Sequence, residues 1–296
     1  MEPSSRNREG GSFVGTAVSD SLIQQVMSVT RSGVGMWAIA AADFGAELEL
    51  VEVPEPVAGP NELKVRLFAA SVNPFDRKVV NGMLRSSAPH QFPLVPGTDG
   101  AGEVEGSGER IFGTFFHRPV GAGTYAEYVT VPAGNALAPL PDDMDPAVAA
   151  ALPTAGMTAL QLVESLGTAE SVLIVGASGG VGSFAVQIAR AAGKRVIPIG
   201  RGDSLVEADA LIDLVSADRS SFEANARYAP LAFNTNYVSA DQAQNFGMKG
   251  SRETLVRLAS MVQAGDLEVP IARRVPLREA TDVFAGHKPG KTVIIM

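Results

Sequence analysis

A glycine-rich segment in the middle of the chain has the residue types and the spacing of an anion-binding turn. Residues 176–182 read Gly-Ala-Ser-Gly-Gly-Val-Gly, and the apolar run Val172 to Val175 before them predicts a buried strand. A helical pattern follows, with Val181, Phe184 and Ile188 on one face. The free N–H groups and the positive dipole end at the start of such a helix can hold a phosphate.

This strand–turn–helix context predicts that the turn binds a dinucleotide. Gly179 would let the backbone approach a pyrophosphate, and Gly182 would let the helix pack closely on the strand. Ala177 takes the place of the usual first glycine. A turn that only connects a strand to a helix is the alternative, and the context on both sides favours the cofactor. The expected binding residues of the turn are Ala177, Ser178, Gly179, Gly180, Val181 and Gly182.

The end of the next predicted strand bears on which dinucleotide binds. That strand is Arg195 to Ile199, and an enzyme that uses NAD usually carries an acidic residue at its end to hold the ribose 2′-hydroxyl. Here Arg201 occupies this region, and a guanidinium pairs well with the 2′-phosphate of NADP. Arg201 is equally consistent with a solvated loop arginine, since Asp203 lies close enough to pair with it. We expect NADP(H).

Composition excludes several classes of partner. The net charge of −8 argues against nucleic acid and against an anionic membrane surface, and no apolar run approaches the roughly 20 residues of a membrane span. The sequence has no cysteine, which removes disulfides and thiolate zinc sites, and its three histidines lack the spacing of metal ligands. We expect no metal, a small-molecule partner and a cytoplasmic protein.

Composition and the positions of Pro and Gly also divide the chain into segments. Residues 1–35 are rich in Ser, Gly and Arg and predict a disordered extension, so Met1, Met27 and Met36 are alternative starts. From Met36 many short strands follow, among them Trp37 to Ala40, Leu48 to Val53 and Leu63 to Ala70. Beyond them, a helix is predicted from Pro146 with Asp145 as its N-cap, another at Thr158 to Ser165, and later strands at Ala210 to Leu214, Leu231 to Phe233 and Tyr237 to Ser239.

Several short motifs in one order carry a family resemblance. They are Ser71 to Lys78 (SVNPFDRK), Pro96 to Gly102 (PGTDGAG), Gly108 to Gly113 (GERIFG), Gly123 to Val129 (GTYAEYV), Leu152 to Ala159 (LPTAGMTA), the glycine-rich turn, and Gly290 to Val293 (GKTV). From Met36 to Met296 the chain resembles the medium-chain dehydrogenase/reductase superfamily, and most of all its zinc-independent quinone oxidoreductase branch, which includes zeta-crystallin. The cysteine-ligated zinc of the alcohol dehydrogenases in that superfamily is excluded by composition.

The resemblance implies an α/β protein with a GroES-like β-rich catalytic domain at 36–152, a Rossmann cofactor-binding domain at 153–265 and a segment, 266–296, that returns to the catalytic domain. The Rossmann domain departs from the family pattern. Between Arg201 and Leu267 the chain is shorter than the roughly 80 residues that four strands and their connections need. We therefore expect the second half of the Rossmann sheet to be shortened.

The resemblance also implies the site. Asn73 and Thr158 would face the nicotinamide, with Asn73 also toward the substrate, although Asn-Pro is a common turn and Thr158 also suits a helix start. Thr154, at the same helix start, is also expected to bind the cofactor. Tyr125 would return a proton or be a core residue, and Lys78 would reach a cofactor phosphate or be a surface cation.

These features predict an NADPH-dependent, zinc-free reductase that passes hydride to a quinone or another α,β-unsaturated carbonyl. The alternative is a catalytically weak dinucleotide-binding protein, and fewer than five parallel strands in the cofactor-binding sheet would favour it. A homodimer is the expected assembly.

Overall fold

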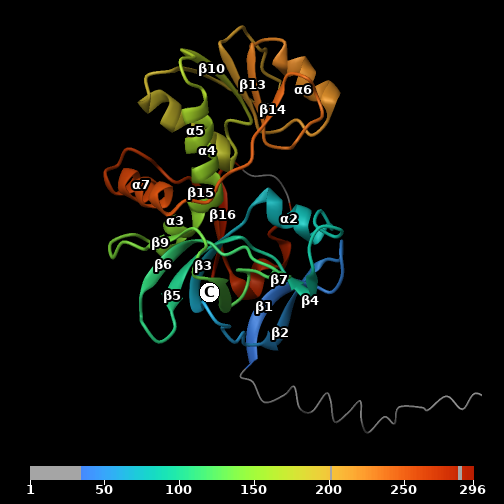
Figure 1. Ribbon diagram of the computed structural model, residues 1–296, viewed down its shortest axis with the longest axis vertical. Helices are drawn as coiled ribbons and strands as arrows, with labels where there is room; N and C mark the ends of the chain where they lie inside the picture. The colour runs from blue at the N-terminus through green and yellow to red at the C-terminus, as the bar shows by residue number, and fades with distance from the viewer. Residues whose placement is uncertain (1–34, 201, 286–288) are drawn as a thin grey trace, which may run out of the picture. The chain divides into compact units, whose positions relative to one another are not determined.

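The computed structural model describes residues 35–200, 202–285 and 289–296 (Figure 1). The predicted extension therefore lies outside the described residues, except for Gly35, which begins the first strand. Arg201 also lies outside them.

Two sheets build the β-rich part of the chain (Figure 1). The smaller sheet has the order β2-β1-β4-β7, and the larger has the order β15-β16-β3-β5-β6-β9 with β8 paired to β3. The strands of the first part of the chain are β1 (Gly35–Ala41), β2 (Leu48–Pro54), β3 (Glu62–Ser71), β4 (His90–Val95), β5 (Asp99–Val104), β6 (Arg110–Thr114), β7 (Val120–Ala122), β8 (Tyr128–Pro132) and β9 (Leu137–Pro139).

The last strands of the chain join the larger sheet. β16 (Lys291–Ile295) pairs antiparallel with β3, and β15 (Ile271–Pro276) pairs parallel with β16. A 3-10 helix, η1 (Leu277–Asp282), follows β15. The first residue of β16, Lys291, is thereby brought next to residues more than 200 positions earlier in the sequence.

Two consecutive helices lead into the cofactor-binding sheet. α3 (Pro146–Ala151) has the predicted N-cap, because the Asp145 carboxylate accepts a hydrogen bond from the Ala147 N–H at 2.8 Å. α4 (Pro153–Ser165) begins five positions before the predicted helix, with a proline in its first turn. Thr158 is therefore an interior helical residue, and its prediction as a helix-start group is wrong.

The cofactor-binding sheet has five parallel strands within the described residues, in the order β11-β10-β12-β13-β14 (Figure 1). They are β10 (Ser171–Val175), β11 (Arg195–Ile199), β12 (Ala210–Asp213), β13 (Leu231–Asn234) and β14 (Ala243–Asn245). The third predicted strand in this region, Tyr237 to Ser239, is wrong, because the strand after β13 begins at Ala243.

The position of β12 shows where the sheet is short. A complete dinucleotide-binding sheet has the order 3-2-1-4-5-6. β12 pairs with β10 on the side opposite β11, which is the place of strand 4, and β13 and β14 continue outward as strands 5 and 6. The sheet is one strand short, as its length indicated, but the prediction that the second half is shortened is wrong. The first half lacks its third strand among the described residues.

Apolar residues on both faces of this sheet hold the helices. α4 and α5 (Gly180–Ala191) share one core with Val172 and Ile174 of β10, and α7 (Arg252–Gln263) joins the same core through Leu255 and Leu258. On the other face, Leu173 and Leu211 pack with α6 (Arg219–Ala226). This alternation of faces is the doubly wound arrangement that places strand ends at a ligand site.

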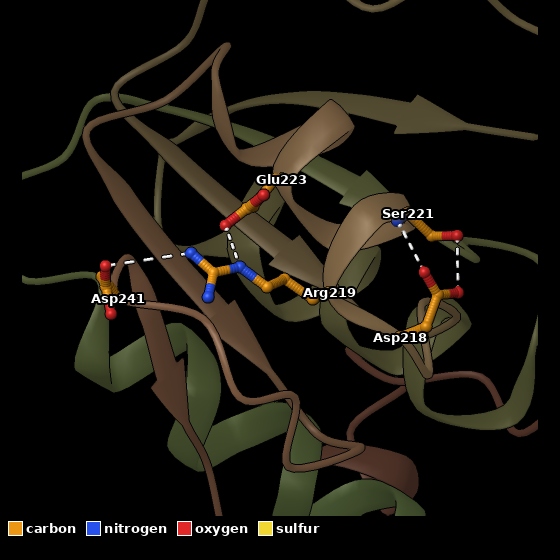
Figure 2. A network of polar contacts seen from close by, with 5 residues as sticks. All are labelled: Asp218, Arg219, Ser221, Glu223 and Asp241. Carbon is orange, nitrogen blue, oxygen red and sulfur yellow. Dashed lines mark hydrogen bonds and ion pairs between the residues drawn. The ribbon is translucent and has the colours of Figure 1, made fainter.

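A polar cluster fixes the start of α6, which connects β12 to β13 (Figure 2). The Asp218 carboxylate accepts hydrogen bonds from the Ser221 N–H at 2.9 Å and from the Ser221 hydroxyl at 2.7 Å, which satisfies a free amide of the first turn. Arg219 pairs with Glu223 at 2.7 Å and with Asp241 at 3.9 Å. Both ion pairs are exposed, so the cap contributes more to the helix than they do.

Candidate functional site

The glycine-rich turn has the geometry of an anion cradle. β10 ends at Val175, Gly176 adopts a φ of +85°, and α5 begins at Gly180. The Ser183 N–H donates to the Gly179 carbonyl, so the three amides of residues 180–182 precede this bond and belong to the free first turn. Three N–H groups and the positive end of a 12-residue helix thus point toward one place.

Two glycines bring the turn and the helix into contact. A Cβ on Gly182 would lie 2.2 Å from the Gly176 carbonyl oxygen and 2.7 Å from Cα of Ala177, so only glycine allows this close packing. The tight turn itself belongs to Gly176, whose positive φ favours glycine. The expectation that Ala177 takes the place of the first glycine is therefore wrong, because Gly176, the residue directly after the strand, makes the tight turn.

A cleft of about 370 Å³ opens in front of the turn. Its volume falls in the range of small-molecule sites. Five distant parts of the sequence line it. They are the turn, the start of α2 (Pro74–Val80), Ala155 of α4, the residues just after β12, and the return segment up to the start of β16. The lining residues that bear on chemistry are Asn73, Arg77, Gly179, Gly180, Val181 and Lys291.

The Asn73 side chain is held from both sides. Its Nδ2 donates to Oδ2 of Asp99 at 2.9 Å, and its Oδ1 accepts from Nζ of Lys291 at 2.7 Å. Asp99 also accepts hydrogen bonds from Thr154, from the N–H at 3.0 Å and from the hydroxyl at 2.7 Å. Because Lys291 can only donate and the Asp99 carboxylate accepts, the orientation of the Asn73 amide is fixed.

A second buried carboxyl, Asp76, lies next to this chain of contacts. Its Oδ2 accepts from the Asn73 N–H at 2.8 Å and from the Tyr125 hydroxyl at 2.9 Å, and its Oδ1 accepts from the Thr98 hydroxyl at 2.8 Å. Burial raises the pKa of Asp76 to about 7, and the Asp99 charge adds to the rise, while the three hydrogen bonds act against it.

Asp99 and Lys291 form the charged centre of the cluster. Burial raises the pKa of the Asp99 carboxyl, and the charge of Lys291 together with the hydrogen bonds from Thr154 and Asn73 opposes that rise. Burial lowers the pKa of Lys291, while Asp99 and Asp76 oppose the fall. The Asp99 carboxylate and the Lys291 ammonium each lower the free-energy cost of burying the other. Loss of either group therefore leaves an uncompensated buried charge.

The structure brings some of the predicted site residues together and separates others. Asn73 and the turn residues Ser178 to Gly182 line the cleft. Thr154 contacts the same cluster through Asp99. Lys78 is exposed, does not line the cleft, and donates to Oδ1 of Asn236 at 2.9 Å, two residues beyond β13.

Two predicted catalytic residues have structural contacts instead. Tyr125 is 0 % exposed, and its hydroxyl donates to the buried Asp76 carboxyl, so it is a core residue that does not reach the cleft. Its prediction as a proton donor does not agree with this placement. The Thr158 hydroxyl donates to the Thr154 carbonyl at 2.6 Å, one turn earlier in α4, and Thr158 does not line the cleft.

Sequence reasoning missed Asp99 and Lys291 as site residues and did not assign Asp76 a role. Each lies inside a motif that carried the family resemblance, yet none was selected from it. The available signal was a charged residue within apolar surroundings, as in Lys291, which precedes the strand residues Thr-Val-Ile-Ile-Met at the end of the chain.

The described ranges hold neither a cluster of metal ligands nor a membrane-spanning helix. No group of three His, Asp or Glu side chains among residues 35–200, 202–285 and 289–296 is placed to hold a metal ion. No helix within the same ranges has both the length and the apolar character needed to cross a membrane.

Comparison with known sequences identifies a domain family in the β-rich part of the chain. Residues 59–142 match the alcohol dehydrogenase GroES-like domain. A chloroplast envelope quinone oxidoreductase homolog from Arabidopsis thaliana is 39% identical over 168 residues, which are 51% of this chain and 50% of that protein. The quinone oxidoreductase of Mus musculus is 33% identical over 174 residues, covering 55% and 51% of the two chains. The chain thus aligns with about half the length of these curated relatives.

Solved structures extend the likeness to nearly the whole described chain. The quinone oxidoreductase from Coxiella burnetii superposes with a TM-score of 0.77 at 26% identity, over 89% of this chain and 100% of that one. The chain carries this GroES-like domain and is similar, in sequence and in fold, to quinone oxidoreductases. This similarity agrees with the resemblance that its motifs show to the medium-chain dehydrogenase/reductase superfamily. A further structure, the Pseudomonas syringae quinone oxidoreductase, has a TM-score of 0.75 at 21% identity and supports the fold.

The similarity to quinone oxidoreductases implies a nicotinamide dinucleotide, and the residues present fit one. The turn would hold the diphosphate, because residues 180–182 offer free amides and Gly179, which also lines the cleft, adds no side chain beside them. Asn73 and Lys291 lie in the same cleft as the turn.

Proposed function

We propose that this protein is an NADPH-dependent, zinc-free reductase that transfers hydride to a quinone or another α,β-unsaturated carbonyl. The observation that carries the proposal is the shared cleft. The anion-binding turn and the fixed amide of Asn73 line one cavity of about 370 Å³, so a diphosphate and a reacting carbonyl can be held together.

When bound, the reduced nicotinamide supplies a hydride with two electrons, which forms a C–H bond on the acceptor while the displaced π pair moves to the carbonyl oxygen. The protein's part is to orient the two reactants and to stabilise the oxygen that gains charge. Among the described lining residues, the Asn73 amide carries a polar hydrogen suited to that oxygen. The oxygen then takes a proton from water.

The first experiment is a titration of the purified protein with NADPH and with NADH, followed by nicotinamide fluorescence. We expect micromolar affinity for NADPH and clearly weaker binding of NADH. A panel of quinones and enones would then give the rate of NADPH oxidation for each acceptor. Absence of binding to both dinucleotides would overturn the proposal.

The preference for NADPH is proposed from sequence, with Arg201 as the contact to the 2′-phosphate. We expect Arg201→Ala to weaken NADPH about tenfold and to leave NADH unchanged, while Arg252→Ala, at the exposed start of α7, changes neither. Asp203 is the competing possibility. Its carboxylate accepts a hydrogen bond from the Gly200 N–H at 2.8 Å, just beyond β11. If Arg201→Ala binds NADH more tightly than the wild type does, Asp203 is the residue that contacts the ribose of the dinucleotide.

A second function rests on the missing strand. A sheet with one strand fewer than six buries less apolar surface, which favours a dinucleotide-binding protein with weak catalysis. Against it, the described sheet keeps five parallel strands and all three strands of the second half. Tight NADPH binding with no oxidation by any acceptor in the panel would select this function.

The expected homodimer and the expected cytoplasmic location stay predictions. We propose the outer strand β14 (Ala243–Asn245) as the dimer edge, because it ends the described sheet on that side. Light scattering after size-exclusion chromatography gives the mass in solution, and a mass close to 30.8 kDa would exclude the dimer.

A further inference from the structure

A buried lysine connects the anion-binding turn to Asn73. Lys291 is 3 % exposed, and its stem passes the start of α5 so closely that a Cβ on Gly180 would lie 2.8 Å from Cδ of Lys291. The residue before it, Gly290, donates its N–H to the Ser178 carbonyl at 3.0 Å. Nζ of Lys291 then reaches past the turn to Oδ1 of Asn73.

The hydrogen bonds with Lys291 and Asp99 leave the Asn73 side chain with one N–H donor for a ligand. Oδ1 of Asn73 accepts from Lys291, and one N–H of Nδ2 donates to Asp99. An amide nitrogen has two N–H donors, so the second N–H of Asn73 remains for a molecule in the cleft. Without Lys291, Oδ1 loses this donor, and among these contacts the amide is held only through the bond from Nδ2 to Asp99.

We propose that Lys291 is a positioning residue for the reduction step, which fixes the Asn73 amide so that its second N–H meets the carbonyl oxygen of the acceptor. This inference rests on the proposed function and deepens it. The ligand class is a conjugated carbonyl, since its oxygen gains charge as the hydride arrives and a correctly placed donor then stabilises the transition state more than the ground state.

The test is a double-mutant cycle in the full chain. Lys291→Met should lower the rate constant for quinone reduction by about 10- to 100-fold while the Kd for NADPH changes less than about threefold. Asn73→Ala should lower the same rate constant by about 100-fold. If Lys291 acts through Asn73, the double variant is no slower than Asn73→Ala. Lys249→Met, at an exposed lysine, is the matched control.

A second variant and a ligand-free readout keep the test independent of folding and of turnover. Lys291→Gln retains a donor without the charge and should lose less rate than Lys291→Met. In 1H–15N spectra of the protein without ligand, the side-chain amide signals of Asn73 (identified by their loss in Asn73→Ala) should shift in Lys291→Met and stay unchanged in Lys249→Met.

The outcomes separate the inference from the function on which it rests. Rates that multiply in the double variant, or unchanged Asn73 signals in Lys291→Met, overturn the positioning role while the wild-type protein still reduces quinones. A large rise in the Kd for NADPH with an unchanged rate constant makes Lys291 a phosphate contact and also overturns it. A wild-type protein that neither binds nor oxidises NADPH overturns both proposals.

Discussion

Nζ of Lys291 donates a hydrogen bond to Oδ1 of Asn73 at 2.7 Å, between residues 218 positions apart. The contact joins the return strand β16 to the start of α2, and through Asp99 and Thr154 it continues to α4. One buried polar chain therefore links the segments that line the cleft, and changes within it should affect stability and chemistry together.

Asp99 is the group that compensates the charge of Lys291. We expect Asp99→Asn to lower the free energy of unfolding by about 3 kcal/mol, because it leaves a buried cation without its counter-charge. Urea unfolding followed by circular dichroism measures the loss. Asp142→Asn, at a fully exposed carboxylate, should change it by less than about 0.5 kcal/mol. Equal stability of the two variants would contradict the charge pairing.

Asp76 makes stability depend on pH. Its pKa is about 7 in the folded protein, mainly because of burial, against an ordinary value of 3.8. Between these values the folded state keeps a proton that the unfolded state has released, so the free energy of unfolding falls as the pH rises from 3.8 through 7. This part of stability is fully present below about pH 4 and is lost above about pH 7, a change of roughly 4 kcal/mol at most.

The matching experiment compares the wild type with Asp76→Asn, which does not titrate. Thermal unfolding at intervals from pH 4.5 to pH 8 should show the wild type losing stability relative to the variant as the pH rises. Asp99 and Tyr125 face the same group and remain in both proteins, so the difference isolates Asp76. Parallel curves would show that Asp76 is ionised throughout.

Gly182 is required by the close approach of turn and helix. In Gly182→Ala the new Cβ meets the Gly176 carbonyl oxygen at 2.2 Å, and a backbone contact of that length forces the turn and α5 apart. We expect at least tenfold weaker NADPH binding and a loss of about 1–3 kcal/mol in stability. Gly134→Ala, in open space, is the control and should leave both unchanged. If Gly182→Ala binds NADPH as tightly as the wild type does, the turn is not part of the cofactor site.

Tyr125 should act through stability and not through catalysis. Tyr125→Phe removes the hydroxyl that donates to Asp76, and we expect a loss of about 1–2 kcal/mol in the free energy of unfolding. The rate constant for quinone reduction should stay within about twofold, because the ring is fully buried away from the cleft. A folded variant with a strongly reduced rate would restore Tyr125 as the proton donor.

Local sequence patterns predicted the elements that carry long apolar periods. The strand before the turn, the helix after it and the strand Arg195–Ile199 agree with the structure, as does the N-cap at Asp145. α4 begins five positions before the helix that the sequence predicts, because Pro153 occupies its first position.

Local sequence patterns do not predict the later strands or the polar cluster around Asn73. β12, β13 and β14 have four, four and three residues, too few to show a period, so the missing strand was assigned to the wrong half of the sheet. The contact of Lys291 with Asn73 depends on the pairing of β16 with β3, which no local signal specifies.

The missing third strand also changes what the sheet exposes to other chains. β11 ends the described sheet on one side, in the place that a further strand would cover. An open strand of this kind invites pairing with another molecule and so favours aggregation. β11 carries Pro198 in its interior and Arg195 at its start, and Pro198 lacks the N–H that an added strand would need. The shorter half of the described sheet thus ends in a strand that resists pairing with a further strand.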